Sequence, residues 1–110
     1  MFADFVESDE IAYIDDKNNK LCIARLDERA NRECDLPEAH NVTCLKIGEN
    51  SKRYLLVGYK DGRVEIYDAE YLTKLTVDIQ VEGEVRDMYL AKLRVDHKDW
   101  IYTCVHYLDE

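Results

Sequence analysis

Residues 55–68 read LLVGYKDGRVEIYD, the pattern of a single β-hairpin. A run of apolar and β-branched residues lies on each side of Asp61-Gly62, and both runs have the composition of strands. Asp-Gly is favoured in the two-residue hairpin turn because both central positions of that turn need a positive φ. The stretch therefore predicts two antiparallel strands joined at Asp61-Gly62.

Comparable runs occupy most of the remaining chain. A second hairpin is expected around Asn18-Asn19, because asparagine tolerates a positive φ better than other non-glycine residues. Residues 42–47 and 100–107 have strand composition. Residues 72–81 alternate between apolar and polar, as expected of a strand with one solvent-exposed face. Residues 84–95 fit both a strand and a helical stripe, and the strand is favoured because the neighbouring segments are strands.

The composition is that of a globular chain with an acidic surface. Of the 110 residues, 46% are apolar, and 24 acidic against 15 basic residues give a net charge of −9. Such a surface repels phosphate, so nucleic acid is not an expected ligand. No apolar run approaches the roughly 20 residues of a spanning helix, and the first ten residues are acidic where a signal peptide is basic. We therefore expect no membrane contact and a cytoplasmic or nuclear location.

A catalytic or metal-binding set is not evident. The four cysteines form no CxxC pair, so Cys34, His40 and Cys44 match a zinc site only weakly, and buried thiols within strands are the expected state. Neither serine has a histidine close in sequence, and the four glycines form no phosphate loop. We expect no catalytic residue, no cofactor and no metal.

The chain contains an internal repeat. An offset of 43 residues matches 11–14 to 54–57 and 21–24 to 64–67, and a further shift of 46 places 100–107 on 54–61. A period of about 40–45 residues with four strands per unit is typical of β-propeller blades.

On these residues the chain resembles the WD-repeat family, most strongly over 38–70. AHNVTCLKIGENSKRYLLVGYKDGRVEIYD, residues 39–68, looks like one blade: His40 stands at the histidine of the family's Gly-His motif, and Tyr67-Asp68 stand at its Trp-Asp. The resemblance implies a buried, hydrogen-bonded structural set. Its members here are His40, Tyr59, Asp61 and Tyr67, with Gly62 in the turn.

By this resemblance the whole chain, 1–110, is a single all-β domain of about two and a half antiparallel four-stranded blades. The first blade spans 2–36, the central blade 38–81, and an incomplete third blade 84–110. Closed propellers have about four to eight blades, so this partial propeller cannot close alone. The last strand is expected to leave an edge free for a partner, at Trp100, Tyr102, Val105 and Tyr107. The alternative fold is a small autonomous β-sandwich or partial barrel.

The expected function is a non-enzymatic protein–protein interaction or scaffold module. A partner protein, further copies of the chain or further sequence would complete the propeller. The alternative is a β domain that binds a small molecule or serves an enzyme through an acidic site. A thermal-shift screen separates the two, since only a binder is stabilised in proportion to ligand concentration.

Overall fold

The computed structural model of the chain describes residues 3–7, 10–25, 31–49, 53–75 and 79–108. For residues 3–7, 49, 91–95 and 98–102 it describes the backbone alone. No helix among the described residues is long and apolar enough to cross a membrane.

The fold is all-β, as the sequence predicts. The described elements are β1 (Ala3–Glu7), β2 (Glu10–Asp15), β3 (Lys20–Arg25), β4 (Arg32–Asp35), the 3₁₀ turn η1 (Ala39–Asn41), β5 (Val42–Glu49), β6 (Arg53–Tyr59), β7 (Arg63–Asp68), β8 (Ile79–Gln80), β9 (Glu84–Val95) and β10 (Lys98–Leu108). The ambiguous segment 84–95 is a strand along its whole length, because it pairs with β10 from Glu84 opposite Leu108 to Val95 opposite Lys98.

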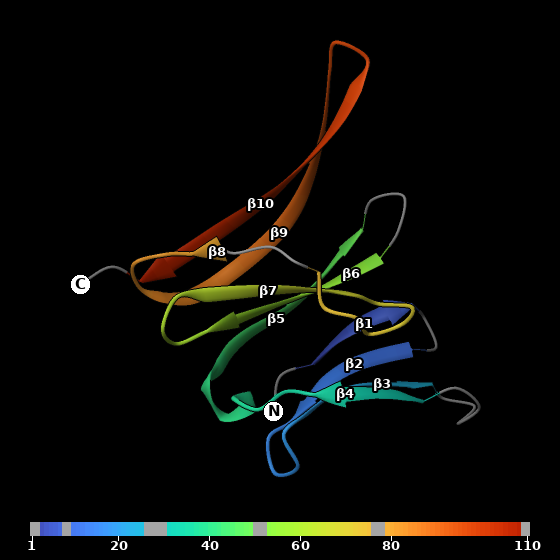
Figure 1. Cartoon of the computed structure of the whole chain (residues 1–110), viewed down its shortest axis with the longest axis vertical. Coiled ribbons are helices and arrows are strands. Elements are labelled where there is room, and N and C mark those ends of the chain that lie inside the picture. The colour runs from blue at the N-terminus through green and yellow to red at the C-terminus, as the bar shows by residue number, and fades with distance from the viewer. Residues whose placement is uncertain (1–2, 8–9, 26–30, 50–52, 76–78, 109–110) are drawn as a thin grey trace.

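The strands form three antiparallel sheets in which consecutive strands are neighbours (Figure 1). We call β1–β4 the first sheet, β5–β8 the central sheet and β9–β10 the C-terminal hairpin. The first two sheets each have four strands. The three sheets are separate, so the described strands close no barrel.

The turn at Asp61-Gly62 differs from the prediction. Three residues separate β6 from β7, and of Asp61 and Gly62 only Gly62 has a positive φ, +90°. The two-residue turn with a positive φ at both positions lies instead between β9 and β10, where Asp96 has a φ of 52° and His97 a φ of 63°. In the first hairpin Asn19 adopts a φ of 56°, which agrees with the role expected of asparagine there.

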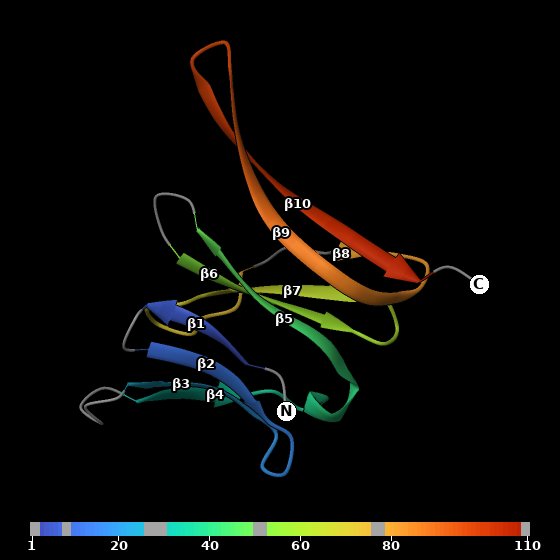
Figure 2. The ribbon, with the colours of Figure 1, turned by 180° about the vertical axis from the view of Figure 1, so that it is seen from behind.

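The central sheet lies between the other two sheets (Figures 1 and 2). Side chains alternate along β6, so Leu55 and Val57 face the first sheet while Leu56 faces the C-terminal hairpin. The buried cluster toward the first sheet contains Ala12, Ile14, Leu21, Ile23, Leu36, Ala39, Val42, Leu45, Leu55, Val57, Tyr59, Tyr67, Ala69 and Leu72. The cluster toward the hairpin contains Cys44, Leu56, Val64, Ile66, Val85 and Met88.

The opening strands of the three sheets are neighbours across the stack. β5 contacts β1 on one side and β9 on the other, and β9 also contacts β6. The Thr43 hydroxyl donates a hydrogen bond of 2.6 Å to the carbonyl oxygen of Val85. Gly58 permits this close approach, because a Cβ there would lie 2.8 Å from the Cβ of Val85. The sheets therefore meet most closely along β1, β5 and β9.

The structure corrects the repeat alignment in one strand pair. At an offset of 43, Ala12 matches Leu55. Both residues lie in the cluster between the first and central sheets, so Ala12 faces the next sheet along the chain whereas Leu55 faces the preceding one. The register pairs Ala12 with Ile23 and Leu56 with Ile66, so Leu56 is the equivalent of Ala12. The offset is 44 there because the turn between β2 and β3 has four residues and the turn between β6 and β7 has three.

This corrected alignment gives every sheet two distinguishable faces. We call the face directed toward the next sheet along the chain the front, and the opposite face the back. The front of the first sheet packs on the back of the central sheet, and the front of the central sheet packs on the back of the hairpin. The back of the first sheet and the front of the hairpin are the two ends of the stack.

Candidate functional site

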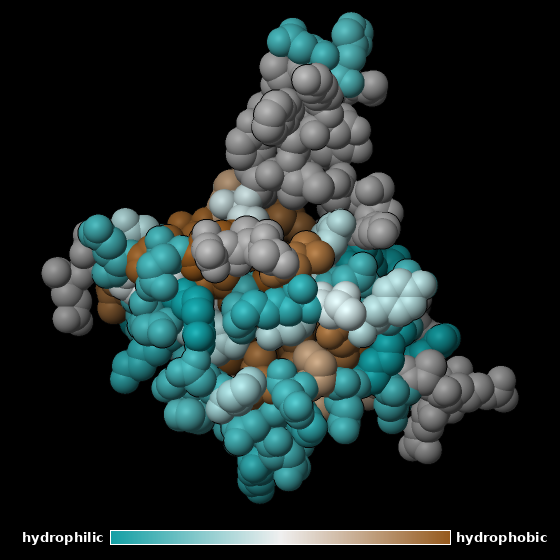
Figure 3. Space-filling model, in the orientation of Figure 1, coloured by the Kyte–Doolittle hydropathy of each residue, from teal (hydrophilic) through white to brown (hydrophobic). Residues whose placement is uncertain are grey.

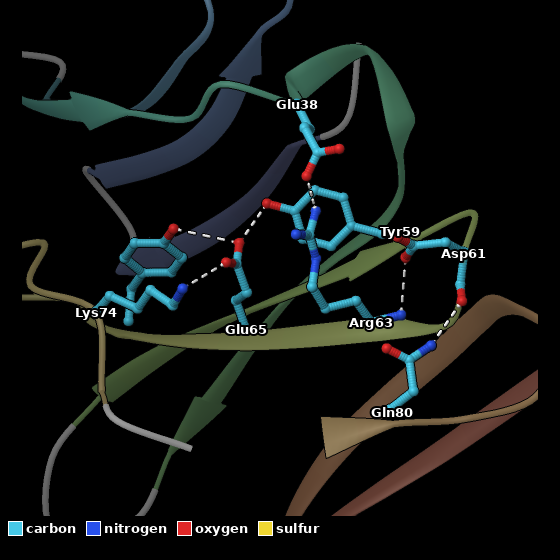
Figure 4. A network of polar contacts seen from close by, with 8 residues as sticks. Glu38, Tyr59, Asp61, Arg63, Glu65, Lys74 and Gln80 are labelled. Atoms are coloured by element: carbon cyan, nitrogen blue, oxygen red, sulfur yellow. Dashed lines mark hydrogen bonds and ion pairs between the residues drawn. The ribbon is translucent and has the colours of Figure 1, made fainter. Parts of the chain in front are cut away.

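Two of the predicted blade residues meet at a buried carboxylate. Tyr59 ends β6, while Glu65 and Tyr67 alternate along β7, so all three side chains lie on the back face of the central sheet. Only 1% of Tyr59, 8% of Glu65 and 5% of Tyr67 is exposed. Both phenol hydroxyls donate a hydrogen bond to Oε1 of Glu65, that of Tyr67 over 3.3 Å (Figure 4).

Lys74 completes the set around Glu65. Its Nζ lies 2.8 Å from Oε2 of Glu65, and its backbone forms a bridge with Tyr67 that holds the segment beside β7. Burial acts to raise the pKa of Glu65, but the hydrogen bonds from Lys74 and Tyr59 outweigh it, so this pKa is lowered. The pKa values of both tyrosines are raised, mainly by burial and secondly by the negatively charged Glu65. Glu65 is therefore a carboxylate and the two phenols are neutral donors.

Arg63 links this set to the segment that joins the first and central sheets. Its guanidinium lies 4.2 Å from the ring centroid of Tyr59, in the geometry of a cation–π contact, and its Nη2 donates a hydrogen bond to Glu38 (Figure 4). Glu38 directly precedes η1. The pair thus links the segment that precedes η1 to the first residue of β7.

A pocket of about 490 Å³ opens beside these residues, between β4 and β7. Its charged lining groups are paired: Glu65 with Lys74, Glu38 with Arg63, and Asp35 with Lys20 at 2.5 Å. Cys34 lines it as well, and burial raises the pKa of this thiol to about 11, which disfavours a nucleophilic thiolate. The four cysteines are free thiols, and within the described part of the chain no three metal-ligating side chains form a group.

His40 and Asp61 lie away from the buried set. His40 is exposed in η1, and Asp61 is exposed in the turn before β7. Asp61 caps that turn, since its Oδ1 accepts a hydrogen bond of 3.0 Å from the backbone N–H of Arg63. Its carbonyl oxygen accepts a hydrogen bond of 2.7 Å from Nε2 of Gln80. The structure therefore groups Tyr59 with Tyr67 and places Glu65, which the sequence interpretation omits, at their centre.

Asp61→Ala is expected to destabilise the fold modestly. The change removes the side-chain bond to Arg63 N–H from an exposed turn, so we expect a loss of about 0.5–1 kcal/mol in the free energy of unfolding. Chemical denaturation measures it. Asp61→Asn keeps an acceptor and serves as the control; equal losses in both variants would contradict the role of this bond.

The predicted partner edge lies on β10. Within the described residues β10 pairs with β9 alone, so its other edge has no strand beside it. Val105 packs toward the central sheet and Tyr107 is half-buried, while for Trp100 and Tyr102 only the backbone positions in β10 are described. The turn end of the hairpin, at Asp96-His97, projects away from the rest of the molecule (Figures 1 and 2).

Tyr89 lies on the front of the hairpin, because it alternates with Met88, which packs toward the central sheet. Tyr89 is 61% exposed and pairs with Cys104 across the ladder.

The view in Figure 3 shows a different part of the surface. Apolar residues reach the surface along the junction of the central sheet with the base of the hairpin and, over a smaller area, lower on this face; most of the other coloured residues are hydrophilic. The half-buried residues at that junction include Leu75, Ile79 and Val81, which pack on the buried cluster between the central sheet and the hairpin. These side chains are packed within the chain, whereas 61% of Tyr89 is exposed.

Comparison of the chain with protein-family models, with curated proteins and with solved structures finds no match.

Proposed function

We propose that the chain is a non-enzymatic interaction or scaffold module, a WD-repeat-like propeller fragment completed by another chain or by further sequence. The observation that supports this most directly is the unequal covering of the sheets. The central sheet is covered on both faces, whereas the hairpin is covered on its back alone and β10 has a free edge within the described residues. Blades bury apolar surface against their neighbours, so a polypeptide at the front of the hairpin would supply the missing contact.

The order of the strands also supports the blade interpretation. Two four-stranded meanders follow each other along the chain. Their opening strands are neighbours, since β1 contacts β5, and β5 in turn contacts β9. A radial array of blades has this arrangement, because the innermost strands lie closest together. The alternative, a small-molecule site at the pocket between β4 and β7, has less support because each charged group there already has a partner.

The proposal predicts that Tyr89→Asp removes a bound protein. A charge on the front of the hairpin opposes burial, and Tyr89 is exposed, so the chain itself should still fold. Tyr71→Asp is the matched control, since Tyr71 is 71% exposed in the turn after β7, away from both ends of the stack. Wild type and both variants are purified from cells at equal amounts, and their bound proteins, including untagged copies of the chain, are quantified by mass spectrometry.

A protein retained by wild type and Tyr71→Asp, and reduced at least about tenfold with Tyr89→Asp, is the expected result. If no protein distinguishes the two tyrosine variants, the front of the hairpin is not an interaction surface and the proposal fails.

A further inference from the structure

Within the chain, each sheet packs its front on the back of the next sheet. One end of the stack is a front and the other is a back, so the two ends could form the same kind of contact with each other. Along the chain this contact occurs twice, between the first and central sheets and between the central sheet and the hairpin. The front of the hairpin is the equivalent of the two fronts that are already covered. The back of the first sheet is the equivalent of the two backs that are already covered.

The back of the first sheet has an apolar area around Ile11, Tyr13 and Ala24, and it also carries Asp15, Lys20 and Glu33. Ile11 and Ala24 pair across β2 and β3, as do Tyr13 and Cys22, on the side opposite Ala12. Ile11, Tyr13 and Ala24 are partly exposed. A hydrogen bond with Cys22 raises the pKa of Tyr13, and one with Cys104 raises that of Tyr89, so both ends present a neutral tyrosine beside a cysteine.

We propose that a second copy of this chain covers the front of the hairpin with the back of its own first sheet, and that two copies close into a ring of six sheets. This inference rests on the proposed function and specifies the polypeptide that completes the fold. The contact is head-to-tail, so each copy contributes one front and one back, and the ring leaves neither end bare. Six sheets lie within the four to eight blades of closed propellers.

The area of the contact favours closure over a single junction. The covering strands β2 and β3 have six residues each, so with a rise of about 3.4 Å per residue and about 4.8 Å between strands the overlap with the two-stranded hairpin is roughly 200 Å². One junction, counted on both partners, then buries roughly 400 Å². Two junctions in a closed dimer bury roughly 800 Å², which is in the class of transient interfaces below about 1,200 Å².

The test uses the purified chain and light scattering coupled to size exclusion at micromolar concentration. Wild type and Tyr71→Asp are expected at twice the 13.0 kDa of the chain. Tyr89→Asp alters the front and Tyr13→Lys alters the back, so each variant is expected to be monomeric. Circular dichroism and thermal unfolding establish that both variants are folded.

Mixing the two variants distinguishes this arrangement from other dimers. In a head-to-tail ring one junction of the mixed pair is unaltered and the other places Asp opposite a face containing Lys, so an equimolar mixture should recover the dimer. A symmetric dimer through the hairpin fronts would be broken by Tyr89→Asp and unaffected by Tyr13→Lys. That result, a monomeric wild type, or a mass that keeps rising with concentration would each overturn the proposal.

The outcome also separates this inference from the proposed function. If the wild type is monomeric but a different protein is retained in a Tyr89-dependent manner, the second copy is wrong and the interaction module stands. If neither is found, both fail.

Discussion

Replacing Gly62 with valine is expected to lower the free energy of unfolding by about 3 kcal/mol, which corresponds to roughly 15 °C in melting temperature for a domain of this size. Gly62 has a φ of +90°, a conformation that a β-branched residue resists. A Cβ there would also meet the carbonyl oxygen of Val81 and lie 2.9 Å from that of Gly83. Because these oxygens belong to backbone, no side-chain rotation relieves the contact.

Thermal unfolding followed by circular dichroism measures the effect. Lys60→Val is the matched control, because Lys60 is exposed in the same turn and does not have a positive φ. We expect its melting temperature to stay within a few degrees of wild type. An unchanged melting curve for Gly62→Val would show that this turn does not constrain the fold.

Glu65→Ala is the second large effect, with an expected loss of about 2–4 kcal/mol. Removing the carboxylate leaves the hydroxyls of Tyr59 and Tyr67 without their acceptor inside the stack. Lys74 loses its ion pair too, but half of its side chain is exposed and water can replace the carboxylate. Chemical denaturation measures the loss, with Glu70→Ala as a control on an exposed glutamate. Similar stability of the two variants would contradict a structural role for Glu65.

The same carboxylate gives a pH dependence of defined sign. Folding lowers the pKa of Glu65, so its contribution is complete above the unfolded-state value of about 4.3 and is lost as the pH falls through the folded-state value. Wild type should therefore lose more stability than Glu65→Gln between neutral pH and about pH 3. The exposed Asp15 and Asp35, whose pKa values are also lowered, contribute equally to both proteins and cancel in the comparison. Parallel stability curves would exclude Glu65 as the group involved.

The sequence predicts most of the strands correctly, because turn residues bound runs of apolar and β-branched residues. The alternating segment 72–81 is an exception, since only Ile79–Gln80 forms a strand among its described residues. The sequence predicts the site less well, since turn length sets which face a side chain takes. The turn between β2 and β3 has one residue more than the turn between β6 and β7. An alignment without gaps therefore matches Ala12 to Leu55, on the opposite face, instead of to Leu56. The type of the turn at Asp61-Gly62 is missed for a similar reason: Asp-Gly suits several turns, and the neighbouring strands select one.

Glu65 was identifiable in principle. A single acidic residue between Val64 and Ile66 in a buried strand requires partners, and alternation places it beside Tyr67. The position of Tyr59 beside Glu65 depends on the register between β6 and β7, and that of Lys74 depends on the path of the chain after β7. Those long-range pairings are a property of the packed sheets and not of any local pattern.

The arrangement of two buried clusters on opposite faces of the central sheet has a consequence for how the molecule opens. The clusters share no buried member, so loss of the hairpin would expose Val85, Met88 and the front of the central sheet while the other cluster stayed closed. The outer layers can therefore detach independently, and the central sheet, held by both, is the last part to open. An assembly that captures the hairpin would protect the layer that is least secured within the single chain.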